Sequence, residues 1–193
     1  MRSLNLDRID GSSVPWLVCL DIQRSVAAEV DPTALTTGQW LLGQARRRRW
    51  PVAHLHRRSP AFSDREGLGD AAPVAGFEPL PSEPLFVRSG LSAFSSPRFR
   101  EWAAAADDDE QIVFLGLGNC ATWLATALGG ADIGIRPALV EDALGVAALG
   151  PMPAEAARHT VFSVTAPFAD WTSAAALVDR TLDAHRPRAA NQP

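Results

Sequence analysis

The sequence predicts a single α/β domain in which a parallel sheet is covered by helices on both faces. Three continuous apolar runs, at residues 14–22, 111–118 and 135–143, lack the polar alternation of half-exposed strands. Such runs are typical of strands that are buried on both faces. Helical patterns lie between them, and strands that alternate with helices indicate βαβ units. The 193 residues are enough for one domain with a full hydrophobic core.

Two shorter segments, 50–57 and 84–89, add strand candidates between these runs. Two of the predicted helices share a start signal, because Asp31 and Ser96 are each followed directly by a proline. The side-chain oxygen of such a residue caps a helix, and proline suits the first helical position. The predicted helices cover residues 31–49, 95–106, 153–164 and 172–186, and one more opens after the glycines of 116–118.

The composition narrows the range of functions. The net charge is −4, with 47% hydrophobic and 21% charged residues, which argues against nucleic acid as the main partner. All 18 basic residues are arginine and tyrosine is absent, so lysine Schiff-base chemistry and a tyrosine acid are ruled out. With two cysteines, no apolar run that could cross a bilayer and no secretory signal, we expect a cytoplasmic protein without membrane contact.

Polar residues follow three of the predicted strands. In α/β folds, ligands bind beyond the carboxyl ends of the strands. This rule places Asp21, Arg88 and residues 118–122 along one edge of the sheet. The segment 58–84 carries five of the fifteen prolines and three glycines without periodicity, and we expect a lid or a binding loop there. A surface excursion with no part in binding is the alternative.

Three short motifs carry a family resemblance: LVCLDIQRSV at 17–26, FVRSGLSAF at 86–94 and GLGNCATWLATA at 116–127. Together they resemble the isochorismatase-like superfamily of cysteine hydrolases, over residues 14–185. The resemblance implies a three-layer α/β/α, Rossmann-like fold with a six-stranded parallel sheet, as one domain over 1–193 with short flexible termini. It also implies a small-molecule substrate, no cofactor, and a homo-oligomer that is a dimer or a tetramer.

Many members of this superfamily hydrolyse small amides with an Asp–Lys–Cys triad, and two of the three residues are replaced here. Asp21 matches the aspartate, whereas Arg88 stands in the place of the lysine, six residues before Phe94. The cysteine position, counted from both of its flanking motifs, falls on Thr122. Cys120 comes two residues earlier, so its side chain points about 200° away from that of Thr122 along a helix. The two side chains cannot both face Asp21, and the spacing favours Thr122.

The same resemblance assigns the residues around the triad. The backbone amides of Thr122 and Gly118 would hold an oxyanion. Zinc-binding relatives carry an aspartate at the position of Val52, so no metal is expected. The remaining candidates for substrate or oxyanion binding are Gln23, Phe94, Asn119 and Trp123, the last of which could equally fill the core.

The replacements decide which chemistry the site can perform. A threonine hydroxyl is far less acidic than a thiol, and arginine is always charged and cannot pass a proton. We therefore expect a hydrolase-like enzyme on a small anionic metabolite, with Asp21 as acid or base. Arg88 would hold Asp21 ionised or bind and orient the substrate, and Thr122 would supply a hydroxyl or oxyanion contact. The isochorismatases proper offer a precedent, since they have glycine at the cysteine position and use the aspartate as general acid on a vinyl ether.

Two other functions stay open. An irregular backbone at the start of the helix would bring Cys120 into the nucleophile's place and make the protein a cysteine amidohydrolase. Alternatively, the protein would be a pseudoenzyme that binds a small molecule without any reaction. Dependence of turnover on Cys120 separates the first of these from an Asp21 enzyme, and binding without product identifies the second.

Overall fold

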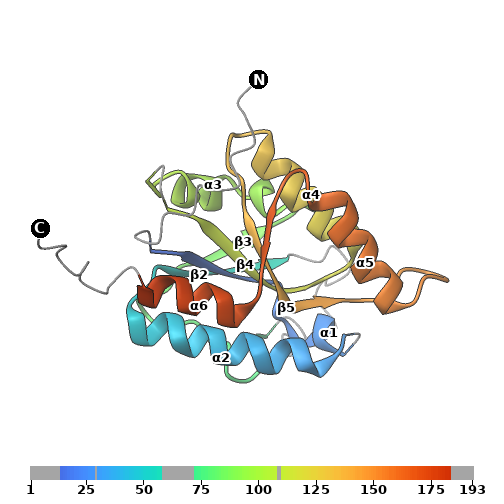
Figure 1. Ribbon diagram of the computed structural model, residues 1–193, viewed down its shortest axis with the longest axis horizontal. Helices are drawn as coiled ribbons and strands as arrows, with labels where there is room; N and C mark the ends of the chain where they lie inside the picture. Colours follow the sequence, from blue (N-terminus) through green and yellow to red (C-terminus); the bar gives the residue numbers. More distant parts are fainter. Residues whose placement is uncertain (1–13, 29, 58–71, 108–109, 184–193) are drawn as a thin grey trace, which may run out of the picture.

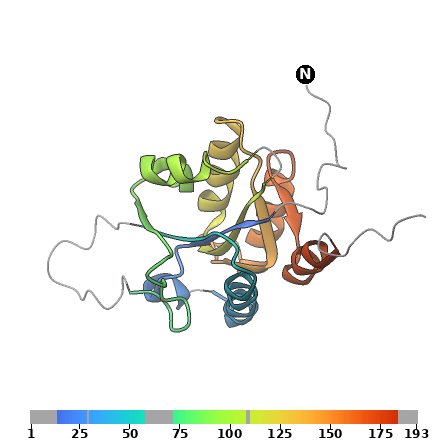
Figure 2. The ribbon, with the colours of Figure 1, turned by 90° about the vertical axis from the view of Figure 1, so that its left-hand side faces the viewer.

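Six parallel strands form one sheet with helices on both faces, as Figures 1 and 2 show. The computed structural model of the protein describes residues 14–28, 30–57, 72–107 and 110–183. The strand order is β3-β2-β1-β4-β5-β6, and every neighbouring pair is parallel. The prediction of a three-layer α/β/α fold with a six-stranded parallel sheet is therefore confirmed.

The first five strands overlap the five predicted strand segments, although β5 is shifted by three residues, and the sixth was not predicted from the residues. The strands are β1 Trp16–Leu20, β2 Val52–Arg57, β3 Leu85–Arg88, β4 Ile112–Gly118, β5 Ala138–Val146 and β6 Asp170–Thr172. Strand β6 lies at the edge of the sheet, has only three residues and begins with a charged one. Such a strand leaves no apolar run in the sequence.

Helices α2 and α3 begin at the two prolines that the capping signals marked, and the short helix α1 was not predicted. They are α1 Arg24–Ala27, α2 Pro32–Arg48, α3 Pro97–Ala103, α4 Cys120–Ala131, α5 Ala154–Thr165 and α6 Ala174–Asp183, with a 3₁₀ turn η1 at Ala93–Ser95. At α2 the Asp31 side chain accepts a hydrogen bond from the Thr33 N–H at 2.8 Å. At α3 the Ser96 side chain makes no capping hydrogen bond, so this helix start rests on the proline.

Two hydrophobic cores lie on opposite faces of the sheet. Helices α3, α4 and α5 pack on one face, where Phe99, Trp123 and Val161 are buried. Helices α2 and α6 cover the other face, with Leu41 and Leu177 buried. Because both faces are covered, the polar chemistry of the fold is confined to the ends of the strands.

Strand β1 lies in the middle of the sheet. The chain adds β2 and β3 on one side of β1 and then crosses to its other side to form β4. This reversal is the topological switch point at which α/β folds bind ligands. Strands β1 and β4 approach very closely there. Gly116 has a φ of +151°, and a Cβ atom on it would lie 2.0 Å from the carbonyl oxygen of Leu20. Only glycine fits at this position, which lies opposite Leu20, the residue directly before Asp21.

The predicted lid, 58–84, falls partly outside the described residues, which exclude 58–71. Its described part packs on α2 and on the turn after β1. The Val74 N–H donates to the Ile22 carbonyl at 3.0 Å, and Phe77 is buried against Gly38. The predicted flexible termini, 1–13 and 186–193, also lie outside the described residues. Among the described helices, none combines the length and the apolar character that a membrane span requires.

Candidate active site

Asp21 directly follows β1 at the switch point. Its φ is +51°, in the left-handed region that aspartate tolerates better than most residues. The backbone is held there by two hydrogen bonds of 2.8 Å, from the Asp21 N–H to the Leu55 carbonyl and from the Gln23 N–H to the Asp21 carbonyl. The residue is only 2% exposed. A buried, charged group with an uncommon backbone conformation is typical of a functional position.

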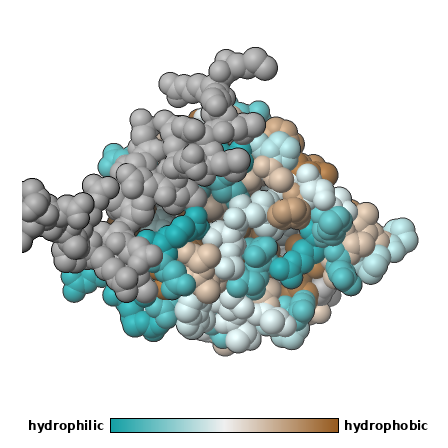
Figure 3. Space-filling view, in the orientation of Figure 1, coloured by the Kyte–Doolittle hydropathy of each residue, from teal (hydrophilic) through white to brown (hydrophobic). Residues whose placement is uncertain are grey.

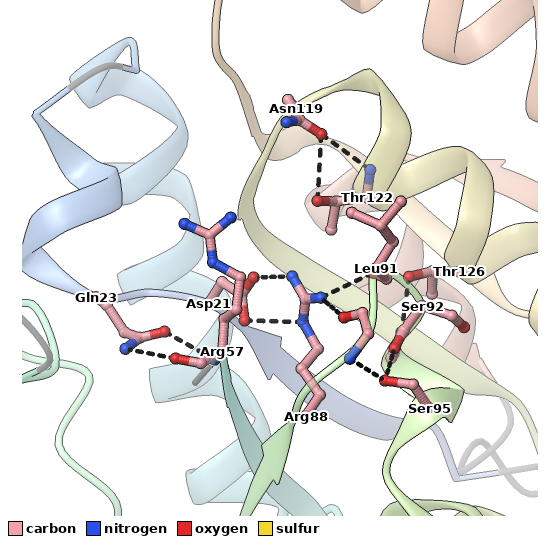
Figure 4. Close-up of polar contacts among 12 residues, drawn as sticks. Asp21, Gln23, Arg57, Arg88, Leu91, Ser92, Ser95, Asn119, Thr122 and Thr126 are labelled. Atoms are coloured by element: carbon pink, nitrogen blue, oxygen red, sulfur yellow. Dashed lines mark hydrogen bonds and ion pairs between the residues drawn. The ribbon is translucent and has the colours of Figure 1, made fainter. Parts of the chain in front are cut away.

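Arg88 binds Asp21 through a two-pronged ion pair, as Figure 4 shows. Its Nε donates to Oδ1 of Asp21 at 3.2 Å, and its Nη2 donates to Oδ2. Its Nη1 donates to the Leu91 carbonyl at 2.9 Å and to the Gly90 carbonyl. Arg88 is 1% exposed, so this guanidinium serves contacts within the protein. The structure thus brings the two predicted residues together, and of the two roles expected for the Arg88 guanidinium it holds Asp21 and does not face a substrate.

The turn that follows β3 holds Arg88 in this orientation. Ser95 Oγ accepts a hydrogen bond from the Gly90 N–H at 3.1 Å and donates to the Ser92 carbonyl at 2.7 Å. The Ala93 N–H donates to Thr126 Oγ1 of α4 at 3.1 Å. These bonds tie η1 to α4 and point two backbone carbonyls at the Arg88 guanidinium.

Opposing influences act on the Asp21 carboxyl. Burial raises its pKa above the ordinary value, whereas the hydrogen bond and the charge of Arg88 lower it, and the charge of Arg57 also lowers it. Burial prevails, and the pKa is raised. The ion pair with an always-charged guanidinium therefore coexists with a carboxyl that takes up a proton more readily than a solvated aspartate.

At the start of α4, the Thr122 side chain packs closely against Gly118. A Cβ atom on Gly118 would lie 3.1 Å from the Thr122 side chain. Asn119 caps the helix: its Oδ1 accepts from the Thr122 N–H at 3.0 Å and from the Thr122 hydroxyl at 3.3 Å. Both groups expected to contact the substrate are thus engaged by Asn119. Among the described residues, no hydrogen bond joins Thr122 to Asp21.

Cys120 lies on another side of α4. Its thiol donates to the Ala157 carbonyl of α5 at 3.3 Å, and the half-buried side chain packs against the hydrophobic core. Helix α4 is regular from its first residue, so the contacts of Cys120 and Thr122 diverge as their spacing requires. No irregularity of the kind that would bring Cys120 into the nucleophile's place is present in this described helix.

Three of the expected ligand-binding residues have structural contacts instead. Trp123 is 0% exposed and lies in the core cluster under α4. Phe94 is also buried there, with its ring 5.4 Å from that of Phe99. Gln23 is buried and holds the backbone of Arg57: its Oε1 accepts from the Arg57 N–H at 2.9 Å, and its Nε2 faces the Arg57 carbonyl at 3.5 Å. Both aromatic rings pack in the core, which for Trp123 is one of the two roles that the sequence left open.

Arg57 lies at the candidate site, although the motifs did not point to it. It ends β2, is exposed, and stands in register with Arg88 on the neighbouring strand. Figure 4 shows its side chain beside Asp21. The rule that ligands bind at the carboxyl ends of strands would have found it, since it is the last residue of the predicted strand 50–57.

The position of a zinc ligand in some relatives is filled by Val52, which is buried in the core. The histidine two residues later, His54, lies with its Nε2 2.8 Å from Oε2 of Glu83. Burial and the neighbouring His54 lower the pKa of His56 to about 4. Burial also lowers the pKa of His54, although the hydrogen bond and charge of Glu83 act in the opposite direction. Both histidines are therefore neutral around pH 7, and His54 belongs to a structural contact with the segment before β3.

Solved structures with the same fold come from several organisms. An isochorismatase from Pseudomonas putida superposes with a TM-score of 0.72 at 21% identity, over 88% of its chain and 83% of this one. A cysteine hydrolase from Pseudomonas syringae pv. phaseolicola has a TM-score of 0.75 at 16% identity, over 93% of its chain and 89% of this one. The MAR1 ribonuclease from Caenorhabditis elegans has a TM-score of 0.68 at 16% identity, over 96% of its chain and 94% of this one.

At these identities the likeness concerns the fold. No curated protein matches the chain with significant similarity. The sequence itself matches the Isochorismatase domain family over residues 15–175, which is most of the chain and includes Asp21, Arg88 and Thr122. The chain belongs to the isochorismatase family of hydrolase-type enzymes, as its three motifs indicated.

Proposed function

We propose that the protein is a hydrolase that acts on a small anionic molecule through Asp21, without a cysteine nucleophile. The observation that supports this proposal is the divergence of the two candidate groups. Asp21 lies buried at the switch point of the sheet, whereas the Cys120 thiol donates to the Ala157 carbonyl on α5. An acid–base reaction at Asp21 needs no thiol.

In this reaction Asp21 protonates the bond that breaks, and the water that adds to the substrate returns a proton to Asp21. The raised pKa of the buried carboxyl assists the first transfer. Arg88 holds the carboxylate in place after the proton has left. The Thr122 hydroxyl contacts the substrate when it leaves Asn119. A vinyl ether, the bond that the isochorismatases proper cleave, is the first substrate type to test.

A second function, binding without reaction, is favoured by one feature of the site. Both oxygens of Asp21 are bound to Arg88, and both polar groups of Thr122 are bound to Asn119. If a ligand does not displace these contacts, the site recognises a small molecule and leaves it unchanged. Cysteine-dependent amide hydrolysis has no such support, because Cys120 faces α5.

The experiment is a turnover assay on small carboxylates that carry a vinyl ether, an ester or an amide, with products followed by NMR. We expect product from at least one substrate, with a loss of about a hundredfold or more in Asp21→Asn and little change in Cys120→Ala. Thermal denaturation of both variants controls for folding. Turnover that depends on Cys120 and passes through a covalent adduct contradicts the proposal, and binding without any product supports the second function.

A further inference from the structure

The charges around Asp21 do not balance. Asp21 and Arg88 neutralise each other in a buried ion pair. Arg57 adds a second guanidinium beside the same carboxylate, and its charge lowers the pKa of Asp21. Within the described residues, Arg57 forms no ion pair of its own. Among the described residues, one positive charge is therefore left over at the switch point, in a protein whose net charge is −4.

The two arginines differ in what their donors do. All three nitrogens of the Arg88 guanidinium donate to protein oxygens, on Asp21, Gly90 and Leu91. Arg57 is exposed, and in the described part of the chain its guanidinium makes no hydrogen bond. Figure 4 shows the two guanidinium groups on opposite sides of Asp21. A free guanidinium presents five N–H donors in a planar fork that matches a carboxylate or a phosphate.

The position of Arg57 is set by Gln23. The Gln23 amide accepts from the Arg57 N–H at 2.9 Å, and its NH₂ group faces the Arg57 carbonyl at 3.5 Å. Gln23 is itself fixed, because its carbonyl accepts from the Val26 and Ala27 N–H groups at 3.0 Å and its backbone bridges to Pro73. A buried side chain that bonds both polar groups of one residue defines where that residue's side chain begins.

We propose that Arg57 binds the anionic group of the ligand, a carboxylate or a phosphate, and that Gln23 is the positioning residue that holds Arg57 at the site. This inference rests on the proposed function for the idea that the switch point is the ligand site. It departs from the sequence prediction in two respects. Arg57 takes the recognition role expected of Arg88, and Gln23 acts through Arg57 instead of touching the ligand.

The test uses benzoate, its neutral counterpart benzamide, and inorganic phosphate as probes for the full-length protein, with binding measured by ligand-induced NMR shifts. In Arg57→Gln we expect the affinity for the better anion to fall about tenfold, and in Arg57→Lys by less, because lysine keeps the charge but not the fork. Benzamide should bind equally weakly to all variants. Whichever of benzoate and phosphate binds with the higher affinity identifies the anionic group that the ligand carries.

Arg47→Gln is the matched control. Arg47 is an exposed arginine near the end of α2, which leads into the start of β2, so it lies at the opposite end of the sheet from Arg57. This variant has the same change in net charge and should bind the anion like the wild type. Equal binding by wild type and Arg57→Gln, equal losses in Arg57→Gln and Arg47→Gln, or no anion binding by the wild type would each overturn the proposal.

The role of Gln23 is tested by a double-mutant cycle. Gln23→Ala should weaken anion binding several-fold, while Gln23→Ala combined with Arg57→Gln should bind no more weakly than Arg57→Gln alone. Independent, additive losses would show that Gln23 does not act through Arg57. Asp21→Asn separates this inference from the proposed function, because it should lower turnover about a hundredfold or more yet bind the anion at least as tightly as the wild type. Anion binding through Arg57 without any turnover would refute the hydrolase and keep the anion site.

Discussion

Two carboxylate–arginine pairs in this protein have similar geometry, but the pKa of the carboxyl group is shifted in opposite directions. At the switch point, Arg88 grips both oxygens of Asp21. On α2, Arg46 donates to both oxygens of Glu83 through Nε and Nη2, each at 2.8 Å. Yet the pKa of Asp21 is raised, whereas the pKa of Glu83 is lowered to about 2. The fork alone therefore does not decide the protonation of the carboxyl.

The difference comes from burial and from the number of other donors. Burial raises the pKa of both groups, but Glu83 also receives the Leu80 N–H at 3.0 Å and lies 2.8 Å from His54 Nε2. These contacts, with Arg46, outweigh its burial. Asp21 is more buried than Glu83, and the groups that lower its pKa do not outweigh that burial. Glu83 thus fastens the segment before β3, while Asp21 remains able to exchange a proton.

Loss of the arginine should have its largest effect at the switch point. Arg88→Met leaves Asp21 buried without its partner, and we expect unfolding to become easier by about 3–5 kcal/mol. Arg46→Met should cost about 1–2 kcal/mol, because Arg46 is partly exposed and water can replace it. Urea denaturation at pH 7 measures both. In the double variant Asp21→Asn with Arg88→Met, much of the loss should return, and equal losses at the two pairs would refute the contrast.

Removing the Glu83 charge should produce a loss that depends on pH. Glu83→Gln is expected to cost about 1–3 kcal/mol at pH 7, since it weakens hydrogen bonds to a charged group. The Glu83 pKa is lowered from 4.5 to about 2, so its contribution is present above pH 4.5 and is lost as the pH falls toward 2. Urea midpoints of wild type and variant should therefore converge in acid. A constant difference from pH 7 to pH 3 would contradict this.

The smallest effect is expected at Asp21, with the opposite sign. A carboxyl whose pKa is raised by folding disfavours the folded state once the pH exceeds its unfolded value of 3.8. The stability of the wild type relative to Asp21→Asn should therefore decrease as the pH rises from about 3.5 toward neutrality, because the Asp21 pKa is raised in the folded protein. Urea denaturation of both proteins across this range is the measurement. A relative gain in wild-type stability would show that Arg88 outweighs burial.

The sequence predicted most of the fold because buried parallel strands leave long apolar runs. Strand β6 was not predicted, since three residues starting with Asp170 form no apolar run. At the site, Asp21 and Arg88 were predicted at one edge because strand ends meet there. Their two-pronged pairing depends on the turn after β3, which local patterns do not describe. Trp123 could not be assigned either, because helical spacing alone does not say which face of α4 meets the core.

The most direct measurement is the rate at which iodoacetamide labels Cys120 in the wild type and in Asp21→Asn, with Cys19 as internal control. Burial raises the pKa of the Cys19 thiol, so this residue should label very slowly in both proteins. If the site works through Asp21 and not through a thiolate, Cys120 should label at the same rate whether or not Asp21 is ionisable. Labelling of Cys120 that slows strongly in Asp21→Asn would mean that the aspartate activates this thiol, and a cysteine hydrolase would replace the function proposed here.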